Sequence, residues 1–539
     1  MKSPIIYSAE ESFQAGSKIE AASVHSENND NEHHNLSLLR SLSRNSYPID
    51  RIATDHSLAI PTDEYNKPST NDDNGDIIIV DWDGPEDPEN PRNWPKAKKV
   101  RNIILMAAMT FITPFASSAY APALPELERQ FKTSATLTGF SVSIFVLAFG
   151  IGPMTLAPLG ETFGRRPIYI IGYGTFSLLN IACAKAKSIE MLIVFRFLSG
   201  FFGSAGISNG GGSISDMYTN IERTRVVGWY IIGPLAGPSL GPIVGGLVTQ
   251  YLSWNWVFYI ILIISGINTF LGFIFLKESY APVLLARKAK AMEKELGKPC
   301  LPVMHDPRSL PRRLISAIQR PIRILITQPV VFGIAVYMAL IYGTLYLMFT
   351  TFPTVFEYRY GFQPAVVGLV YLGCGVGFLI SIIFGVRAID KTYRRLTEKN
   401  GGVSKPEYRL PVANLGVVLI PISLFWYGWC VQAKVHYMVT IIGTIPFGMG
   451  QILIFQSSQN YFIDCYSRYA ASSIAAGATF RAVVGSTFPL FGPKMFEKLG
   501  YGWGFTMLGL LAVLLIPGPF ILWRYGERIR EKYPMSFNF

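Results

Sequence analysis

The chain has 539 residues, of which 50% are hydrophobic and 16% are charged, whereas about 25% of the residues in an ordinary soluble protein are charged. This composition argues against a soluble enzyme, and the 49 glycines suit closely packed transmembrane helices. A net charge of +12 would suggest a nucleic-acid partner in a soluble protein. Here the basic residues fall between long apolar segments, so we expect no nucleic acid and interpret the chain as a membrane protein.

Residues 1–95 are rich in Ser, Asn, Asp and Glu and contain no apolar run long enough for a signal peptide. We therefore expect a disordered cytoplasmic tail. Its last part, 81–95, holds too many prolines for a helix. Trp82 and Trp94 lie in this part, and tryptophans favour the bilayer interface.

Twelve apolar segments follow, each about the 20 residues needed to cross roughly 30 Å of hydrocarbon. The predicted fold class is therefore an all-α membrane protein with twelve transmembrane helices. The predicted spans are 102–120, 137–156, 168–184, 191–213, 226–249, 256–276, 330–351, 365–386, 412–431, 437–456, 470–491 and 503–522.

The distribution of basic residues predicts the orientation, because Lys and Arg accumulate in cytoplasmic loops. With the N-terminus inside, the inner loops carry most of the basic residues, and the outer loops carry few, such as Arg129, Lys132 and Arg359. We expect both termini in the cytoplasm. The expected location is the plasma membrane, with the vacuolar membrane as the alternative.

A charged loop, 278–328, divides the twelve segments into two sets of six. The expected domains are an N-terminal half, 96–277, a C-terminal half, 329–524, and a short tail, 525–539. Two six-helix halves joined by a charged cytoplasmic loop resemble the major facilitator superfamily, in which the halves rock about a central site near the bilayer midplane. We expect a monomer in the lipid bilayer.

The loop between the second and third segments reads P-L-G-E-T-F-G-R-R-P and resembles the superfamily's signature loop, G-x-L-a-D-r-x-G-r-k. Glu161 stands in the acidic place, Gly164 in the turn, and Arg165 and Arg166 in the basic places, although the first glycine is missing. The resemblance implies a conformational latch at the cytoplasmic mouth. Asp216, at the end of the fourth segment, is the expected partner of Arg165. The alternative is a loop that only fixes the topology.

Arg196 lies among apolar residues of the fourth segment, where a charge costs about 2.5 to 3.5 kcal/mol on insertion scales. It resembles the arginine of the superfamily's R-x-x-x-G motif, which implies a part in proton transfer. The alternative is that the side chain snorkels to the outer surface, about five residues away.

Gly-Pro pairs recur every four residues in the fifth segment, so the glycines form one slowly drifting helical stripe. Glycine lets another helix approach closely, and proline removes backbone donors. The pattern resembles the antiporter motif G-x(3)-G-P-x(2)-G-G of proton-driven exporters. The residues of this motif are Gly233, Pro234, Gly237, Pro238, Gly241, Pro242, Gly245 and Gly246.

Two further stretches, K-E-S-Y-A-P-V-L-L from Lys277 and Y-F-I-D-C-Y-S-R-Y-A-A-S from Tyr461, are similar to those of fungal twelve-span drug:proton antiporters. That group contains multidrug and polyamine exporters. The pattern D-P-x-N-P-x-N-W ending at Trp94 resembles the same group. A departure is the run W-N-W from Trp254, where relatives usually have W-R-W.

Aromatic and polar side chains within the fourth and later segments are expected to line a substrate cavity, because aromatic faces bind cations and amides orient ligands. Helix packing or interfacial anchoring is the alternative for each residue, and Arg481 is expected to contact either substrate anions or a helix end. No segment has a carboxylate at its centre, so no proton site is assigned. The candidates are Asn209, Tyr337, Tyr342, Tyr346, Tyr371, Gln451, Gln456, Gln459, Asn460 and Arg481.

The expected function is proton-coupled antiport that exports amphipathic or cationic small molecules by alternating access. The alternatives are a specific transporter of a polyamine or an organic acid, and a transport-dead membrane sensor. No nucleotide-binding loop G-x(4)-G-K-[ST] is present, so we expect no ATP-driven pump, no enzyme and no cofactor. The six His and five Cys show no ligand-like spacing, so we expect no metal and no disulfide.

Overall fold

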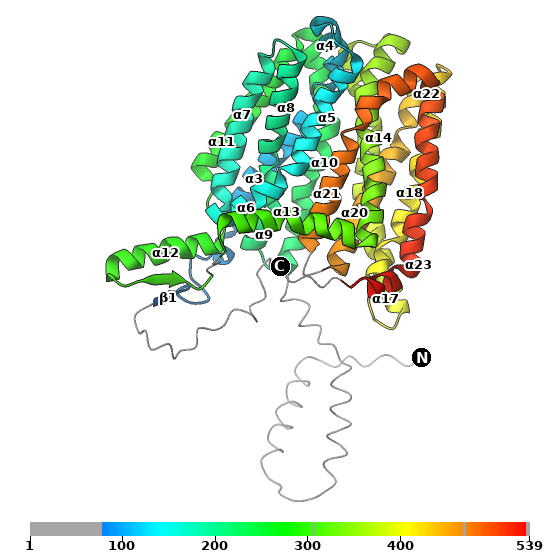
Figure 1. Cartoon of the computed structure of the whole chain (residues 1–539). Helices are drawn as coiled ribbons and strands as arrows, with labels where there is room; N and C mark the ends of the chain where they lie inside the picture. The colour runs from blue at the N-terminus through cyan, green and yellow to red at the C-terminus, as the bar shows by residue number, and fades with distance from the viewer. Residues whose placement is uncertain (1–77, 305–307, 467–469, 535–539) are drawn as a thin grey trace, which may run out of the picture. The chain divides into compact units, whose positions relative to one another are not determined.

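The computed structural model describes residues 78–304, 308–466 and 470–534. Figure 1 shows two groups of helices side by side, with α4 at one end and α13 lying across the opposite end. We call these the α4 end and the linker end. The fold expectation, an all-α membrane protein with two six-helix halves, is confirmed.

Most of the expected tail, 1–77, lies outside the described residues. Over 78–95 the expected disorder is wrong, because this segment docks on the linker. β1 (Ile78–Val80) pairs in parallel with β2 (Cys300–Pro302), and η2 (Pro91–Asn93) is a short 3-10 helix. The Nζ of Lys288 lies 2.7 Å from a carboxylate oxygen of Asp83.

The N-terminal half contains six crossings, two of which are broken into pairs of helices, α5 with α6 and α8 with α9. Between the first two crossings, η3 (Ala121–Ala123) and α4 (Leu124–Phe131) form the α4 end. The crossings are α3 (Lys96–Ser118), α5 (Ala135–Ile151) with α6 (Pro153–Phe163), α7 (Arg165–Ala184), α8 (Ile189–Gly203) with α9 (Ala205–Met217), α10 (Asn220–Tyr251) and α11 (Trp254–Phe275).

The C-terminal half repeats this plan, and its last helix continues to Lys532, so the expected tail from residue 525 begins within that helix. A short helix, η5 (Pro406–Arg409), precedes α18. The elements of its crossings are α14 (Pro329–Tyr360), α15 (Pro364–Val370), α16 (Leu372–Ile380), η4 (Ser381–Gly385), α17 (Val386–Lys399), α18 (Pro411–Gln432), α19 (Tyr437–Ile442), α20 (Ile445–Cys465), α21 (Ala470–Gly485), α22 (Phe488–Leu515) and α23 (Pro517–Lys532).

The expected linker loop is largely helical. α12 (Ala281–Leu296) carries the strand pair beside it, and α13 (Leu310–Thr327) follows. α13 packs against α6 of the N-terminal half and against α21 of the C-terminal half. One of its arginines, Arg313, donates a hydrogen bond to the Thr162 hydroxyl over 3.4 Å. The linker therefore contacts both halves at their linker ends (Figure 1).

Two criteria, helix length and apolar composition, identify helices that could cross a membrane. Within the described residues, nine helices satisfy both criteria for a membrane span, or ten when the bent pair α5 and α6 counts as one. These criteria treat residues 472–532 as one helix. The chain bends at Gly500 in α22, where φ is 74°, so this stretch holds two crossings. The remaining crossing is α10, whose 32 residues include three prolines.

Helix ends follow from residues that the sequence supplies. Ser134 and Ser188 cap α5 and α8, each accepting a hydrogen bond from the backbone N–H three residues on. Gly361, with φ of 71°, ends α14 in the left-handed conformation that glycine adopts without strain.

The two halves touch mainly toward the α4 end. α10 packs against α15 and α16, and α5 packs against α21 and α22. The Arg129 guanidinium, in α4, lies 3.2 Å from the Glu357 carboxylate of α14. Because η3 and α4 also pack on α14, the α4 end of the bundle is held together by both halves.

Candidate functional site

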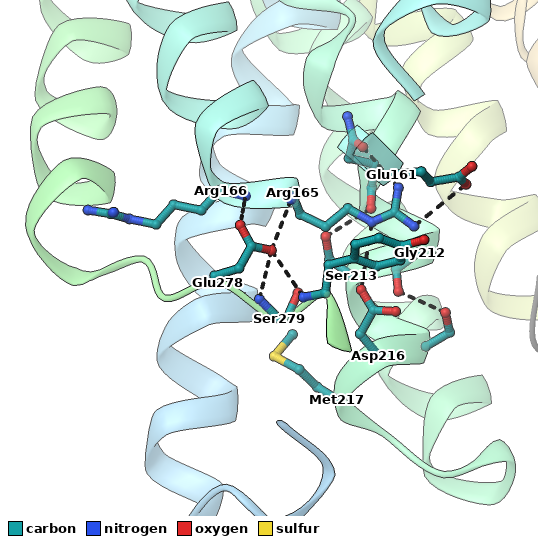
Figure 2. A network of polar contacts seen from close by, with 12 residues as sticks. Glu161, Arg165, Arg166, Gly212, Ser213, Asp216, Met217, Glu278 and Ser279 are labelled. Atoms are coloured by element: carbon teal, nitrogen blue, oxygen red, sulfur yellow. Dashed lines mark hydrogen bonds and ion pairs between the residues drawn. The ribbon is translucent and has the colours of Figure 1, made fainter. Parts of the chain in front are cut away.

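The turn between α6 and α7 begins at Gly164, whose φ of 103° favours glycine. No side chain of the turn itself caps α7. The cap comes from the segment after α11, where the Glu278 carboxylate accepts hydrogen bonds from the backbone N–H groups of Arg165 (2.9 Å) and Arg166 (3.0 Å). Figure 2 shows this carboxylate facing the start of α7. A negative charge is favoured there because the helix dipole is positive at its N-terminus.

Glu278 also accepts the backbone N–H groups of Ser279 and Tyr280, each over 3.0 Å, and its side chain is buried. The Arg166 guanidinium donates to the carbonyl of Phe273 over 2.7 Å, near the end of α11. Glu278 had no expected role beyond its place in a family motif. It joins the end of α11 to the start of α7.

The Arg165 guanidinium is buried at the centre of a charge cluster (Figure 2). Its Nε lies 3.7 Å from the Asp216 carboxylate, and its Nη2 lies 3.8 Å from the Glu161 carboxylate. Its Nη1 donates a hydrogen bond to the side-chain oxygen of Asn209 over 3.1 Å. The structure therefore brings together three of the four charged residues of the predicted latch, whereas the Arg166 guanidinium bonds to α11 instead.

A glycine and an aromatic ring accommodate this guanidinium. A Cβ at Gly212 would lie 2.6 Å from Nη2 of Arg165, so a larger residue would displace the side chain. The guanidinium also lies over the Tyr280 ring, 4.9 Å from its centroid. Burial raises the pKa of the Tyr280 phenol to about 12, so the ring stays a neutral face for the cation.

The partners of this cluster all come from α6, α7, α9 and the segment after α11, which belong to the N-terminal half. Within the described residues, no ion pair or hydrogen bond of Glu161, Arg165 or Asp216 reaches the C-terminal half in this conformation. The latch remains a prediction about another state.

Asn209 was expected in the wall of a substrate cavity, and in this conformation it is buried beside Arg165 instead. Its side chain has no exposed surface. Besides accepting from Arg165, its amide donates to the carbonyls of Leu156 (3.4 Å) and Ala205 (3.2 Å). Asn209 therefore belongs to the charge cluster, because all its polar atoms have partners there.

Arg196 does not snorkel, because its side chain is completely buried. Its guanidinium donates to the carbonyls of Ala116 (3.1 Å) and Ser117 (3.2 Å), which are among the last of α3, and more weakly to that of Ser141 (3.5 Å). The Phe145 ring lies 4.0 Å from the guanidinium carbon. A cation is favoured at this helix C-terminus. Arg196 thus caps α3, and its part in proton transfer stays a prediction.

The glycine stripe of α10 faces two helices. Gly233, Gly237, Gly241 and Gly245 pack on α3; a Cβ at Gly241 would lie 2.5 Å from the carbonyl oxygen of Phe115. Gly246 instead faces the backbone of α15 in the other half. The stripe therefore permits close approach within one half and across the boundary between the halves.

The prolines of α10 also contribute to its contact with α3. Pro242 has no N–H, so the carbonyl of Pro238, four residues earlier, lacks its helical partner. The Ser118 hydroxyl at the end of α3 donates a hydrogen bond to that carbonyl over 2.9 Å. Pro234 and Pro238 lie inside the helix in the same way. The Gly-Pro repeat thus supplies both the space and the acceptor for contact with α3.

Two tyrosines expected at a cavity are instead packed in the C-terminal half. Tyr337 is buried and directs its hydroxyl to the carbonyl of Val417 at 3.5 Å. Tyr371 is fully buried and donates to the carbonyl of Phe349 over 2.5 Å. Their hydroxyls bond to backbone within their own half in this conformation, and their place in a cavity wall stays a prediction.

Three of the other candidates, Tyr342, Tyr346 and Arg481, lie near the boundary between the halves. The Tyr342 and Tyr346 rings lie 5.0 Å apart, and the Tyr346 hydroxyl lies 3.2 Å from that of Ser117 in α3. Arg481, in α21, places its guanidinium carbon 4.6 Å from the centre of the Tyr342 ring. The partly exposed side chains of Gln451, Gln456, Gln459 and Asn460 follow α20.

Comparison with known proteins decides the family. Residues 106–489 match the family model described as Major Facilitator Superfamily. This chain belongs to the major facilitator superfamily. The superfamily consists of transporters, which agrees with the expectation that the chain is not an enzyme.

Two fungal relatives resemble this superfamily member over most of their length. The MFS-type transporter tndD of Aspergillus flavipes is 42% identical over 84% of this chain and 86% of its own. The efflux pump radE of Floropilus chiversii is 40% identical over 85% of each chain. These matches confirm the resemblance to fungal transporters of the drug-efflux type.

Solved structures show the same fold. The partially occluded, inward-open structure of the xylose transporter XylE from E. coli aligns with a TM-score of 0.59, covering 80% of this chain and 98% of that one at 14% identity. At this identity the likeness concerns the superfamily fold alone.

Proposed function

We propose that this chain is a proton-coupled antiporter that exports small amphipathic organic molecules. The observation that carries the proposal is the α10 stripe, which resembles the antiporter motif and packs on α3 in its own half and on α15 in the other. A stripe shared by the two halves is suited to a rocking motion between them. The relative radE is named an efflux pump, which supports the outward direction.

The proposed orientation places the linker end in the cytoplasm of the cell, because the linker and neighbouring loops carry most of the basic residues. On that orientation the halves are joined at the outer side by the Arg129–Glu357 pair and by the packing of α10 on α15. The proposed setting is a monomer in the plasma membrane.

The charges inside the spans help to choose between a polyamine transporter and an organic-acid transporter. Neither half has a carboxylate at the centre of a span, whereas Arg481 lies inside α21, four residues before its end. A polyamine needs anionic partners, so this arrangement disfavours a polyamine transporter. An organic acid suits Arg481 better, and this observation keeps the organic-acid alternative open.

The test uses purified protein reconstituted into vesicles with a pH-sensitive dye inside. A panel of radiolabelled spermidine, a radiolabelled azole and a radiolabelled aromatic acid is offered while a proton gradient is imposed. We expect uptake of one of these compounds against its gradient with matched proton movement, and no effect of ATP. Transport that survives an uncoupler would overturn the proposal.

A further inference from the structure

Two arginines lie inside the spans of this protein, and their surroundings differ. Arg196 donates hydrogen bonds to three backbone carbonyls. Arg481 contacts the faces of two rings, Tyr342 at 4.6 Å and Phe455 at 4.9 Å, and its Nε is buried without a hydrogen-bond partner. Cation–π contacts offset only part of the cost of placing a charge within a membrane. The Arg481 guanidinium is therefore incompletely satisfied in this conformation.

Arg481 lies where the two halves meet. The next residue, Ala482, packs against Gly150 of α5, and Thr479 donates to the carbonyl of Gly150 over 3.3 Å. Tyr346, whose ring packs on that of Tyr342, reaches Ser117 in α3. α14, α20 and α21 thus place the guanidinium and its two rings beside the boundary at which a transported molecule passes in this superfamily.

The charge at this place has no acidic counterpart. The C-terminal half has no Asp or Glu within 329–356, 364–389, 411–463 or 470–496. A second unsatisfied group lies on α20: the side-chain oxygen of Gln451 is buried without a hydrogen-bond partner. Gln451 is one turn before Phe455, so both lie on the same side of α20.

We propose that Arg481 recognises an anionic aromatic substrate, such as an aromatic carboxylic acid or an acidic phenol. The guanidinium binds the acid group by charge-assisted hydrogen bonds, and the Tyr342 and Phe455 rings pack on the aromatic part. The Gln451 oxygen accepts a hydroxyl of the substrate. This inference rests on the proposed export function, and it replaces the expected preference for cations by a preference for anions.

The test compares two dyes with the same ring system. Fluorescein is anionic, and a rhodamine methyl ester is cationic. Binding of each dye to the purified full-length protein is measured by fluorescence anisotropy at a pH at which fluorescein is ionised. We expect fluorescein to bind roughly tenfold more tightly than the rhodamine ester, and Arg481→Gln to abolish this preference. Arg481→Lys keeps the charge and should retain most of it.

Arg387→Gln is the matched control, because it removes the same charge from an exposed position in α17. It should leave the ratio of the two affinities unchanged. Equal affinity of the unaltered protein for the two dyes, including binding of neither, would overturn the proposal. So would a preference for fluorescein that persists in Arg481→Gln.

Failure of this inference and failure of the export proposal are distinguishable in vesicles. If the substrate class is wrong, proton-driven transport of the rhodamine ester continues and Arg481→Gln does not change the preference between dyes. If export is wrong, the dyes bind with the expected preference but a proton gradient drives neither across the membrane.

Discussion

The two halves of this transporter use their buried polar groups differently. In the N-terminal half, Arg196 and Glu278 each bond to several backbone groups of the same half, and Arg165, although its Nε has no hydrogen bond, pairs with the carboxylates of Glu161 and Asp216. In the C-terminal half, Arg481 meets only aromatic rings, and Gln451 keeps an unpaired oxygen. Buried polar groups with full sets of partners hold a structure together, whereas incompletely satisfied groups within a membrane mark a site of function. The comparison predicts different consequences when these residues are replaced.

The largest effect is expected for Arg196→Leu. This change leaves the carbonyls of Ala116 and Ser117, at the end of α3, without their guanidinium donor, at a cost of about 2–4 kcal/mol of stability. Arg481→Leu, which removes the same charge but few hydrogen bonds, should change stability by less than about 1 kcal/mol. Thermal unfolding of both purified variants measures this difference. Equal losses would break the comparison between the halves.

The next effect concerns the stripe that both halves share. A Cβ at Gly241 would lie 2.5 Å from the Phe115 carbonyl and 3.0 Å from the Ser118 hydroxyl, so Gly241→Leu overpacks the contact of α10 with α3, a change that costs about 1–3 kcal/mol. We expect transport to be lost while membrane insertion persists. Gly266→Leu is the control, because nothing lies within 4 Å of a Cβ there. The same initial transport rate in both variants at matched expression would show that close approach at Gly241 is not needed.

A smaller effect is expected from the charge cluster. Arg165→Glu and Asp216→Arg should each lower the transport rate at matched abundance, because a two-state equilibrium shifts about tenfold for each 1.4 kcal/mol. The double variant should recover part of the rate, since the two side chains lie 3.7 Å apart. Recovery should be incomplete, because Glu161 also lies near the guanidinium. Strictly additive losses in this double-mutant cycle would show that Arg165 and Asp216 are not coupled.

The smallest effect concerns the segment that docks on the linker. Hydrogen bonds from the backbone N–H groups of Asp83 and Glu89 lower the pKa of Asp87, with help from Lys288. Bonding to Asp83 raises the pKa of Lys288. The Asp87 contribution is therefore complete above its unfolded pKa of about 3.9 and is lost as the pH falls through its lower folded pKa. The Lys288 contribution is complete below about 10.4 and is lost as the pH rises through its higher folded pKa.

We therefore expect the segment 78–94 to stay docked between about pH 5 and 9. Hydrogen exchange of its amides, followed by mass spectrometry, should show constant protection over this range and faster exchange in Asp87→Asn. A loss of protection near neutral pH in the unaltered protein would contradict the assignment, because neither group titrates there.

Much of the fold was readable from the sequence. Apolar runs of about 20 residues predict spans because the bilayer has a fixed thickness, and the predicted spans fall within the observed helices, apart from their ends. The helical linker and the docked segment 78–95 were missed. Both depend on contacts between distant residues, such as β1 with β2 and Lys288 with Asp83.

The charge cluster was partly predicted. Glu161, Arg165 and Asp216 were grouped correctly because loops and helix ends of one side of a membrane lie at the same depth. Glu278 was missed because its role is to cap a helix that starts more than a hundred residues earlier in the chain. Asn209, Tyr337 and Tyr371 were placed at a cavity because their residue types suit one, yet their polar atoms bond within their own half.

By itself, the sequence determined which segments cross the membrane, how the crossings divide into two halves, and which motifs mark the family. These properties depend on local composition and spacing, which the chain carries regardless of its fold. Only the tertiary structure decided which buried polar groups are satisfied, because a partner for Arg196 or Glu278 comes from another helix and must be placed by packing. The same packing placed the Arg481 guanidinium against two rings, whereas it gave the Arg196 guanidinium three carbonyl acceptors, and this difference separates a structural arginine from one suited to bind a substrate.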